Sequence, residues 1–363
     1  MKVDYSNYMI SGNYKSNVAF KGYDARPLKY ILMRDSYLID TLPAAKEIEK
    51  IGKKHGFGML FEGYEMLEKI PSGKFNSRMI QPWIQDYVHI LKDKLMTVNG
   101  FNRPKLVEKF FNKSVKNMDC HDFVKGGNLF FVKKDGAEKI IVGQNDYAKA
   151  KKMFKTDDII SIPQADYHID LFIRPLKDGK ILVADDRITL SILNNARKIL
   201  AKEQGLVTDD ALAKLDCVIK SMKNALYKRP CQSSENVIKK LEKEGFSVIR
   251  VPGRIVKDHE SSDIKNLLNF MNAIVHENSK GDLVYITNNS GFLRSLGLDK
   301  KIVNHIGLNF EKIFKDSVQE YIKPKNIYFI KGGKEPESEI DFILKSQDGG
   351  IHCMTCEIPQ DVL

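Results

Sequence analysis

Short apolar runs alternate along the chain with longer stretches in which apolar residues recur three and four positions apart. Each short run is bounded by Gly, Asn, Asp or Pro, which is typical of strands that end in turns. The runs lie at residues 27–34, 127–132, 139–143, 180–185, 246–253, 282–289 and 326–333. We therefore expect β-strands at these places.

The helical pattern occupies three stretches between the expected strands: residues 42–56, residues 103–117 and the long block from Ile188 to Glu244. Helix formers dominate the block and are interrupted only around residues 205–210 and 228–234. The alternation of strands and helices predicts an α/β or α+β protein. We expect residues 189–244 to be a helical insertion, or two or three helices that cover the sheets.

The domain organisation follows from length and from the lack of a linker. At 363 residues the chain can bury a large core, and no low-complexity segment divides it into halves. We expect one compact domain from residue 25 to residue 363. Residues 1–24 are polar and rich in Asn, Ser and Tyr, so we expect them to be loosely ordered.

Composition indicates a water-soluble globular protein, with 42% hydrophobic and 29% charged residues. No run of about 18 apolar residues is present, and the first residues lack the basic and apolar blocks of a secretory signal. We expect a cytoplasmic protein without a membrane partner, although export by a route that needs no cleaved signal would leave the same sequence.

The net charge of +11 comes from 58 basic and 47 acidic residues. Lysines spread along most of the chain, and no basic run is interleaved with stacking aromatic residues. This pattern favours a solvated surface over a nucleic-acid interface. A basic surface repels a cationic substrate at long range, so carboxylates in a site for such a substrate would have to attract it locally.

The cysteines favour reduced thiols, because their number is odd and most are far apart. They are Cys120, Cys217, Cys231, Cys353 and Cys356. Cys217 lies in an amphipathic helical stretch, and we expect it in the core.

The last two cysteines form a Cys-x-x-Cys pair in GGIHCMTCEIP, residues 349–359. A zinc site would need two more ligands at suitable spacing, and no second such pair exists. A thioredoxin-like motif should follow a strand and open a helix, whereas Pro359 lies close behind this pair. A single nucleophilic thiol remains the better interpretation. Gly349 and Gly350 would then give a substrate close access to the backbone.

His168 and Asp170 precede an apolar stretch and are two residues apart. If the segment is extended, both side chains lie on the same face. Such a pair can provide a general acid/base and a carboxylate that binds a cation, or it can be an ordinary hydrogen-bonded pair.

Asp86 lies among the apolar residues Trp83, Ile84 and Val88. A buried carboxylate needs a charged or donor-rich partner, because otherwise its pKa rises and it becomes neutral. The alternative is an aspartate that caps a turn.

For the Gly126–Asn128 segment, which opens an expected strand, the simplest interpretation is a turn that requires positive φ.

Four segments together resemble motifs of the guanidine-modifying, or pentein, superfamily, especially peptidylarginine deiminases and agmatine deiminases. They are WIQD (83–86), GGNL (126–129), HIDLFIRPLKDGKILVAD (168–185) and GGIHCMTCEIP (349–359). WIQD is similar to the peptidylarginine deiminase form, whereas HID with its following strand and the GG-x-H-C-x-T turn are most similar to agmatine deiminases. The resemblance covers about residues 25–360. It implies one catalytic domain, a five-bladed α/β propeller of ββαβ units with a helical insertion at about 189–244.

The resemblance also implies roles for individual residues. Cys353 corresponds to the nucleophile, His168 to the general acid/base, and Asp86 and Asp170 to the carboxylates that bind the guanidinium. Trp83, Gly127 and Asn128 lie in the same motifs and are expected to contact the substrate. No metal and no cofactor is implied.

The implied activity is that of a cysteine hydrolase that deiminates a guanidino group to a ureido group and ammonia through a covalent thiouronium intermediate. Arginine in a peptide or protein is the favoured substrate, because of the WIQD form and the helical block. Agmatine or free arginine is an alternative, and so is an amidinotransferase. From another class, a non-catalytic or nucleic-acid-binding basic protein remains. The oligomeric state is not indicated.

Three features depart from the family pattern or lie beside the nucleophile. Cys356 stands where agmatine deiminases usually have an amide, and it is either a packing thiol or a resolving thiol. His352 points away from the nucleophile if its segment is extended, so we expect it to support the site residues or to have a structural role. Tyr87, Val88 and His89 replace the carboxylates that help bind calcium in animal peptidylarginine deiminases, so we expect calcium-independent activity.

Overall fold

The computed structural model describes residues 25–35, 39–62, 82–91, 94–99, 114–164, 166–203, 205–228, 234–258, 264–335, 338–347 and 349–360. The segment 1–24, residues 103–113 of an expected helix, and Cys231 lie outside these ranges. The rest of that expected helix, residues 114–117, is strand instead, because it pairs in parallel with the strand 94–98.

Within the described ranges, five three-stranded sheets share one topology: the central strand pairs antiparallel with one neighbour and parallel with the other. The sheets are β17 (Thr355–Pro359)–β1 (Leu28–Arg34)–β2 (Gly58–Glu62), β3 (Val88–Ile90)–β4 (Lys94–Val98)–β5 (Ser114–Met118), β6 (Leu129–Lys134)–β7 (Ala137–Gly143)–β8 (Ile159–Ile162), β9 (Ile173–Pro175)–β10 (Lys180–Ala184)–β11 (Ser247–Val251), and β14 (Ala273–Glu277)–β15 (Leu283–Asn288)–β16 (Ile327–Ile330). A two-stranded sheet, β12 (Arg254–Asp258)–β13 (Ile264–Asn269), accompanies them. All seven strands expected from the apolar runs are present.

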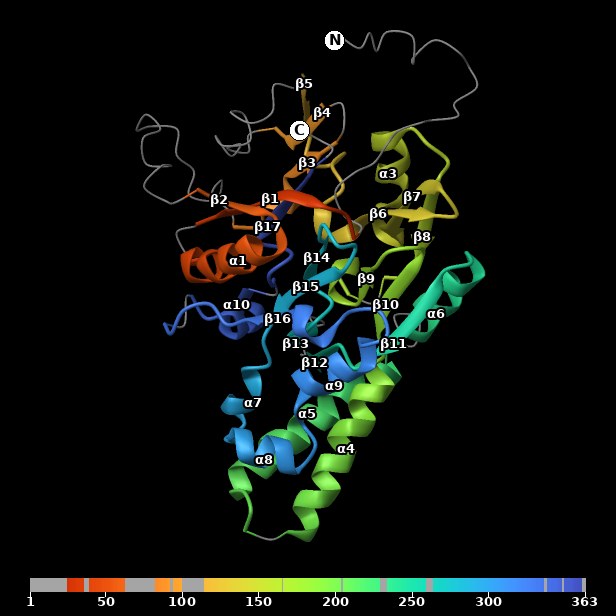
Figure 1. Ribbon diagram of the computed structural model, residues 1–363. Helices are drawn as coiled ribbons and strands as arrows, with labels where there is room; N and C mark the ends of the chain where they lie inside the picture. The colour runs from red at the N-terminus through yellow and green to blue at the C-terminus, as the bar shows by residue number, and fades with distance from the viewer. Residues whose placement is uncertain are drawn as a thin grey trace, which may run out of the picture.

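The first sheet joins the two ends of the described chain. β17 pairs antiparallel with β1, with Leu32 opposite Cys356, so the last strand takes the place that the preceding strand holds in the other four sheets. The nearness of β1 and β17 is visible in Figure 1. The mixed α/β class is confirmed. The sheets are small and separately hydrogen-bonded, and their closure into a five-bladed ring stays a prediction.

Helices provide the crossovers that parallel strands require. The described crossover elements are α1 (Leu42–His55) between β1 and β2, α3 (Tyr147–Phe154) between β7 and β8, α4 (Asp186–Lys202), α5 (Asp209–Lys228) and α6 (Ser234–Lys243) between β10 and β11, and α7 (Phe292–Ser295), α8 (Lys300–His305) and α9 (Phe310–Val318) between β15 and β16. α10 (Ile340–Gln347) precedes β17. No helix in the described ranges is long and apolar enough to cross a membrane.

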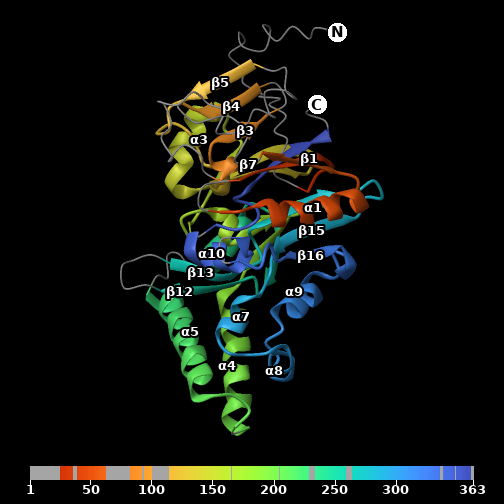
Figure 2. The same cartoon turned by 90° about the vertical axis from the view of Figure 1, so that its left-hand side faces the viewer.

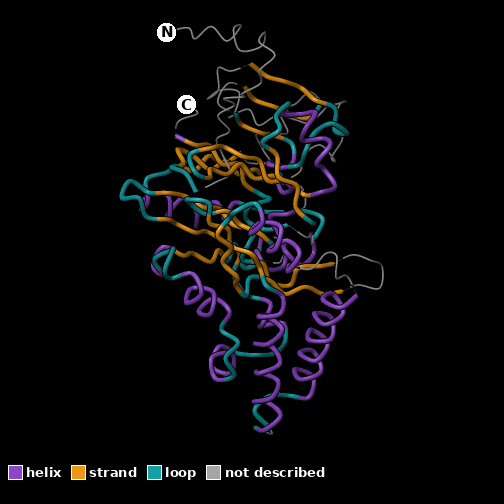
Figure 3. The backbone as a smooth tube through the Cα atoms, turned by 90° about the vertical axis from the view of Figure 1, so that its right-hand side faces the viewer, coloured by secondary structure: helices purple, strands orange, loops and turns teal. Residues whose placement is uncertain are grey.

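The expected helical block is therefore the enlarged crossover of one sheet. α4 and α5 lie side by side and extend away from the sheets in Figures 1 and 2, and Figure 3 shows the strands gathered in the rest of the molecule. The buried apolar positions of α5 are Ala211, Leu215, Val218, Ile219 and Met222. Cys217 lies off this stripe and is exposed, so the expectation of a core thiol was wrong.

A buried ionic cluster joins α4 to the segment that precedes His168. The Arg254 guanidinium, only 2% exposed, donates to both carboxylate oxygens of Asp186 at 3.0 and 2.9 Å, and it lies 3.3 Å from Asp166. Two parallel bonds from a planar guanidinium fix both partners. The cluster therefore ties the start of α4 and the beginning of β12 to the turn that carries two candidate site residues.

We expect Arg254→Met to lower the free energy of unfolding by about 3–5 kcal/mol, because the substitution leaves two buried carboxyl groups without their cation. Urea denaturation measures the change. The matched control is Arg294→Met, which removes an arginine with a 69% exposed side chain from its ion pair with Glu339. The control should lose about 1 kcal/mol or less. Equal losses in the two variants would contradict a special role for the buried cluster.

Candidate active site

The candidate site residues come from turns at equivalent places in the sheets. Short 3₁₀ turns at Ile84–Asp86, Gly126–Asn128 and Ile169–Leu171 lead into β3, β6 and β9, and the turn at residues 351–354 leads into β17. Each of these strands is the antiparallel neighbour of its central strand. The repeated topology thus brings together residues that are far apart in the sequence.

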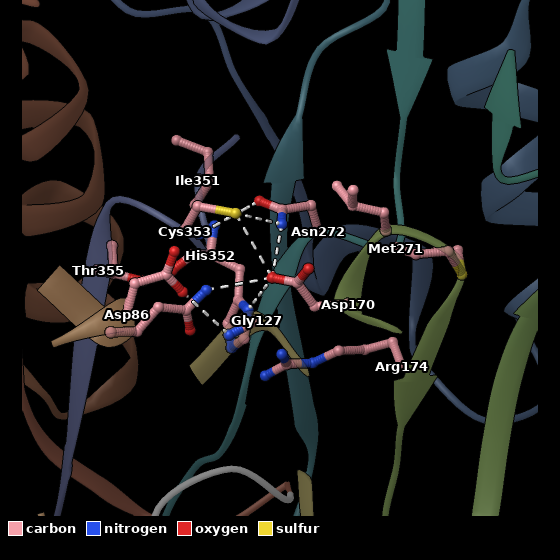
Figure 4. A network of polar contacts seen from close by, with 12 residues as sticks. Asp86, Gly127, Asp170, Arg174, Met271, Asn272, Ile351, His352, Cys353 and Thr355 are labelled. Carbon is pink, nitrogen blue, oxygen red and sulfur yellow. Dashed lines mark hydrogen bonds and ion pairs between the residues drawn. The ribbon is translucent and has the colours of Figure 1, made fainter. Parts of the chain in front are cut away.

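The Cys353 sulfur lies 3.5 Å from Asp170 Oδ2 (Figure 4). Cys353 is 4% exposed and Asp170 is fully buried. The same carboxyl oxygen accepts hydrogen bonds from Gln85 Nε2 at 3.1 Å and Asn272 Nδ2 at 2.8 Å, and it lies 2.8 Å from His352 Nδ1. Burial, with the charge of Asp86, raises the pKa of Asp170 to about 8.

The other Asp170 oxygen and the His168 imidazole meet at Gly127. A Cβ at residue 127 would lie 2.4 Å from His168 Nδ1 and 3.2 Å from Asp170 Oδ1, so only glycine fits. Both atoms are buried, and neither has a hydrogen-bond partner among the described residues. Burial lowers the pKa of His168, which keeps the imidazole neutral. These two unpaired polar atoms therefore face a common point beside the Gly127 backbone.

His168 and Asp170 reach this point by a different route from the one expected. His168 has extended backbone angles, but Ile169–Leu171 form a 3₁₀ turn instead of continuing a strand. The same-face argument assumed a period of two through both residues, and that assumption was wrong. Their convergence at Gly127 comes from the turn.

Asp86 lies on the other side of Gly127 (Figure 4). Its Oδ1 accepts the Gly127 backbone N–H at 3.4 Å, and its Oδ2 lies 3.8 Å from the Lys125 ammonium group, whose side chain is 54% exposed. The carboxyl is 8% exposed. The negative charge of Asp86 also raises the pKa of Asp170, so the two carboxyl groups are close enough for Asp86 to disfavour ionisation of Asp170.

Cys353 is a protonated thiol in this environment. Burial raises its pKa well above the ordinary value, and the negative charges of Asp170 and Asp86 raise it further. Hydrogen bonds from Asn272 and from the Gly350 backbone act in the opposite direction. A cation placed between the carboxyl groups would favour the thiolate.

His352 does not point away from the site as an extended segment would require, but its contact with Asp170 agrees with the expected supporting role. Residues 351–354 form a turn, so the alternation of an extended strand does not apply, and the imidazole contacts Asp170. Burial lowers its pKa well below the ordinary value, and the nearby Arg174 adds to this effect. Arg174 itself forms a fully buried ion pair with Glu357 at 3.0 Å.

Gln85 and Asn272 were not identified from the sequence. Gln85 lies within the WIQD segment, where its neighbour Asp86 was the evident candidate. Asn272 lies in the apolar stretch FMNAIV, and its polarity inside such a stretch is the only signal that the sequence offers. A buried amide in an apolar segment requires hydrogen-bond partners, but the sequence does not name them.

Trp83 and Asn128, expected to contact substrate, contact protein groups in this structure. The Trp83 ring lies against Gly349, where a Cβ would come within 2.5 Å of it. Asn128 donates to Asp146 Oδ2 at 2.7 Å. Beside Gly350 the space is filled by Asn288 and Asn272, so the expected open backbone is closed by side chains.

The Gly126–Asn128 turn has no positive φ, so the expectation of a left-handed glycine was wrong. Close approach is the reason for these glycines, since a Cβ at residue 126 would lie 2.4 Å from the Gln85 carbonyl oxygen. Contact between the Ile84–Asp86 and Gly126–Asn128 turns therefore depends on glycine.

Cys356 lies in a different environment from Cys353. It is 3% exposed and packs in an apolar cluster with Leu32, Ile84 and Val88, between β1, β17 and β3. Burial raises its pKa to about 12. These surroundings favour the packing thiol over the resolving thiol.

The overall fold is similar to that of two solved structures of agmatine deiminase from C. jejuni. A substrate-bound variant is 14% identical, with a TM-score of 0.51 over 93% of this chain and 96% of that chain. A second structure of the enzyme is 15% identical, with a TM-score of 0.50 over 96% and 98% of the two chains. No protein-family model and no curated protein sequence matches the chain. The resemblance inferred from the motifs is thus confirmed at the level of the fold, along nearly the whole length of both chains.

Proposed function

We propose that this chain is a cysteine hydrolase that converts a guanidino group into a ureido group and releases ammonia. The observation that carries the proposal is a thiol 3.5 Å from a buried carboxyl group whose second oxygen, with His168 Nδ1, has no hydrogen-bond partner among the described residues. A guanidinium offers N–H donors in a planar fork and no acceptor. It therefore complements a site that presents acceptors beside a nucleophile.

The charges around the site favour a cationic ligand. Among the described residues, Asp86 forms its ion pair with the half-exposed Lys125, and Arg174 is already paired with Glu357. A guanidinium between Asp86 and Asp170 would lower the pKa of both the Asp170 carboxyl and the Cys353 thiol. Substrate binding would thus generate the charged forms that the resting site disfavours, and it would hold the guanidinium carbon near the sulfur.

The reaction then needs one base that also acts as an acid. Neutral His168 accepts the Cys353 proton, and the sulfur attacks the guanidinium carbon. His168 returns the proton to the departing nitrogen, the C–N bond breaks, and ammonia and a thiouronium adduct form. His168 next deprotonates a water molecule, whose oxygen attacks the same carbon. The C–S bond breaks and the ureido product leaves; one of the two water protons returns to the thiol, and the other passes to solvent, where ammonia takes it up as ammonium.

Arginine within a peptide or protein is the substrate that the WIQD segment supports. Agmatine is the second candidate, and the similarity of the fold to C. jejuni agmatine deiminase supports it. The two substrates share the reacting group and differ at the far end, where agmatine carries an ammonium group and peptidyl-arginine carries neutral amides. Ammonia release without an added amine separates either reaction from amidino transfer.

We expect the protein to release ammonia and a ureido product from at least one of four substrates: agmatine, free arginine, a blocked arginine ester and an arginine-containing protein. Cys353→Ala should lower the rate at least about 10³-fold, because it removes the nucleophile. Cys356→Ala should keep most of the activity, because that thiol packs among apolar side chains. Colorimetric ureido assays on all three proteins measure the rates. If Cys356→Ala loses activity and Cys353→Ala keeps it, the nucleophile is not Cys353. If no product forms from any of the four substrates, the proposal is refuted.

Asp170→Asn should abolish deimination. It should also make the fold more stable than the wild type, by an amount that grows as the pH rises. The pKa of Asp170 is about 8 in the folded protein against an ordinary value of 3.8, so between these values the unfolded chain loses its proton first. The contribution of Asp170 to wild-type stability therefore becomes less favourable over that range, and the variant has no such loss. The advantage of the variant, on the order of a few kcal/mol at pH 8, is measured by urea unfolding at several pH values.

The matched control for this effect is Asp135→Asn, whose side chain is 87% exposed. Its stability should follow the wild-type curve at every pH. An Asp170→Asn curve parallel to that of the wild type would contradict the buried, protonated carboxyl.

We expect activity to be independent of calcium. The residues after Asp86 offer no carboxylate, and His89 is fully buried with Nε2 2.6 Å from the Val124 carbonyl oxygen. A hard cation requires several oxygen ligands. Ammonia release should be equal in EDTA and in millimolar calcium chloride. Stimulation by calcium that EDTA reverses would refute this expectation.

A further inference from the structure

Asn272 occupies the place in the remaining sheet that the candidate site residues occupy in the other four. It immediately precedes β14, the antiparallel neighbour of the central strand β15. The equivalent places before β3, β9 and β17 carry Asp86, Asp170 and Cys353. All five sheets therefore contribute a turn to one site, and Asn272 is the contribution of the β14 sheet (Figure 4).

The orientation of the Asn272 amide is fixed by its partners. Its Oδ1 accepts the backbone N–H groups of His352 at 2.8 Å and of Cys353 at 3.3 Å. Backbone N–H groups only donate, so the oxygen must face them and the amino group must face the other way. On that side Nδ2 lies 3.0 Å from the Cys353 sulfur and 2.8 Å from Asp170 Oδ2.

The surroundings of Asn272 hold this arrangement. The residue is fully buried, its backbone N–H donates to Asn269 Oδ1 at 3.1 Å, and its carbonyl oxygen accepts from Thr287 Oγ1 and Asn288 Nδ2. A Cβ at Gly350 would come within 2.8 Å of Asn272 Oδ1. The amide cannot rotate without breaking several of these contacts.

We propose that Asn272 is a catalytic residue: its amino group donates a hydrogen bond to the Cys353 thiolate while its carbonyl oxygen holds the backbone of the same cysteine. The catalytic part of this inference rests on the proposed deiminase function. Asn272 transfers no proton, since the thiol proton passes to His168. A hydrogen bond to a charged acceptor is roughly twice as strong as one to a neutral acceptor, so the contact favours the thiolate over the thiol.

The ionisable groups around the sulfur make such a donor necessary. Asp170 and Asp86 both oppose a negative charge on Cys353, and Tyr167 is close enough to interact with it. His352 contacts Asp170 and has a strongly lowered pKa, which leaves it without a positive charge at neutral pH. Apart from the Gly350 backbone, Asn272 is the donor to the sulfur among the described residues.

The test measures the nucleophile directly, without a substrate. Iodoacetamide alkylates the thiolate, so the alkylation rate of Cys353 against pH reports its ionisation. The exposed Cys120 and Cys217 also react, and mass spectrometry of peptides separates them. For Asn272→Ala we expect the midpoint of the curve of Cys353 alkylation rate against pH to rise by about one pH unit. The alkylation rate at pH 8 should fall about tenfold.

The matched control is Asn288→Ala. Asn288 is equally buried and its Oδ1 accepts the Ile351 backbone N–H at 2.9 Å, so it holds the same turn without a hydrogen bond to the sulfur. Because Asn288 reaches Asn272 only at its backbone carbonyl oxygen, 3.4 Å away, the midpoint of this variant should stay much closer to that of the wild type than the midpoint of Asn272→Ala does. Asn272→Asp adds a second test in case the alanine variant does not fold, because it keeps an acceptor for the two backbone N–H groups but removes the donor. It should raise the midpoint as well.

The outcomes separate this inference from the proposed function. An unchanged midpoint in both Asn272 variants, or an equal rise in Asn288→Ala, overturns the role of Asn272 even if the wild type releases ammonia from a guanidine. A raised midpoint in the Asn272 variants alone supports the thiolate contact. If the wild type then releases no ammonia from any guanidine, the deiminase proposal fails while the contact remains. Where ammonia is released, kcat should fall about tenfold or more in Asn272→Ala.

Discussion

The burial of the Asp170 carboxyl group beside the Cys353 sulfur is the constraint around which the rest of the site is arranged. The two groups lie 3.5 Å apart with almost no access to water, and burial raises the pKa of both. The charge of Asp170 raises the pKa of Cys353 further, and the charge of Asp86 raises the pKa of both groups. Gln85, Asn272 and His352 all make polar contacts with one Asp170 oxygen and thereby hold it in place. The unligated site is thus electrostatically unfavourable, and a planar cation is the ligand that would relieve this cost.

Such an arrangement requires a rigid support, and the five sheets provide it. In each sheet, a turn leads into the strand that pairs antiparallel with the central strand. These five turns meet because the sheets repeat one topology. The pairing of β17 with β1 brings the turn with Cys353 back to the beginning of the chain. Buried ion pairs add support at two points: Arg174 with Glu357 beside His352, and Arg254 with Asp186 and Asp166 beside the turn of His168.

Glycine has a consistent role in the site: it lets segments come closer than a side chain allows. Gly126 meets the Gln85 carbonyl, Gly127 meets His168 and Asp170, and Gly350 meets Asn288 and Asn272. None of these glycines has positive φ, so the lack of a side chain, and not conformational freedom, explains them. The closeness of the turns, and hence the distance between thiol and carboxyl group, depends on these contacts.

The sequence by itself determined seven of the strands, the helices at residues 42–56 and within 188–244, and the identity of the four motifs, because apolar periodicity and local turn residues are properties of neighbouring positions. It also singled out Asp86, His168, Asp170 and Cys353, which the structure brings to one place. Only the tertiary structure decided which way His352 points, where Asn272 lies, and that residues 114–117 pair as a strand. The local pattern wrongly placed Cys217 in the core. The surface against which a helix packs decides which of its positions are buried, and the local pattern does not contain that surface. Hydrogen bonds between residues 81 to 183 positions apart, such as those of Asn272 and Cys353 with Asp170, are set by the packing of separate sheets, and nothing in the local sequence specifies them.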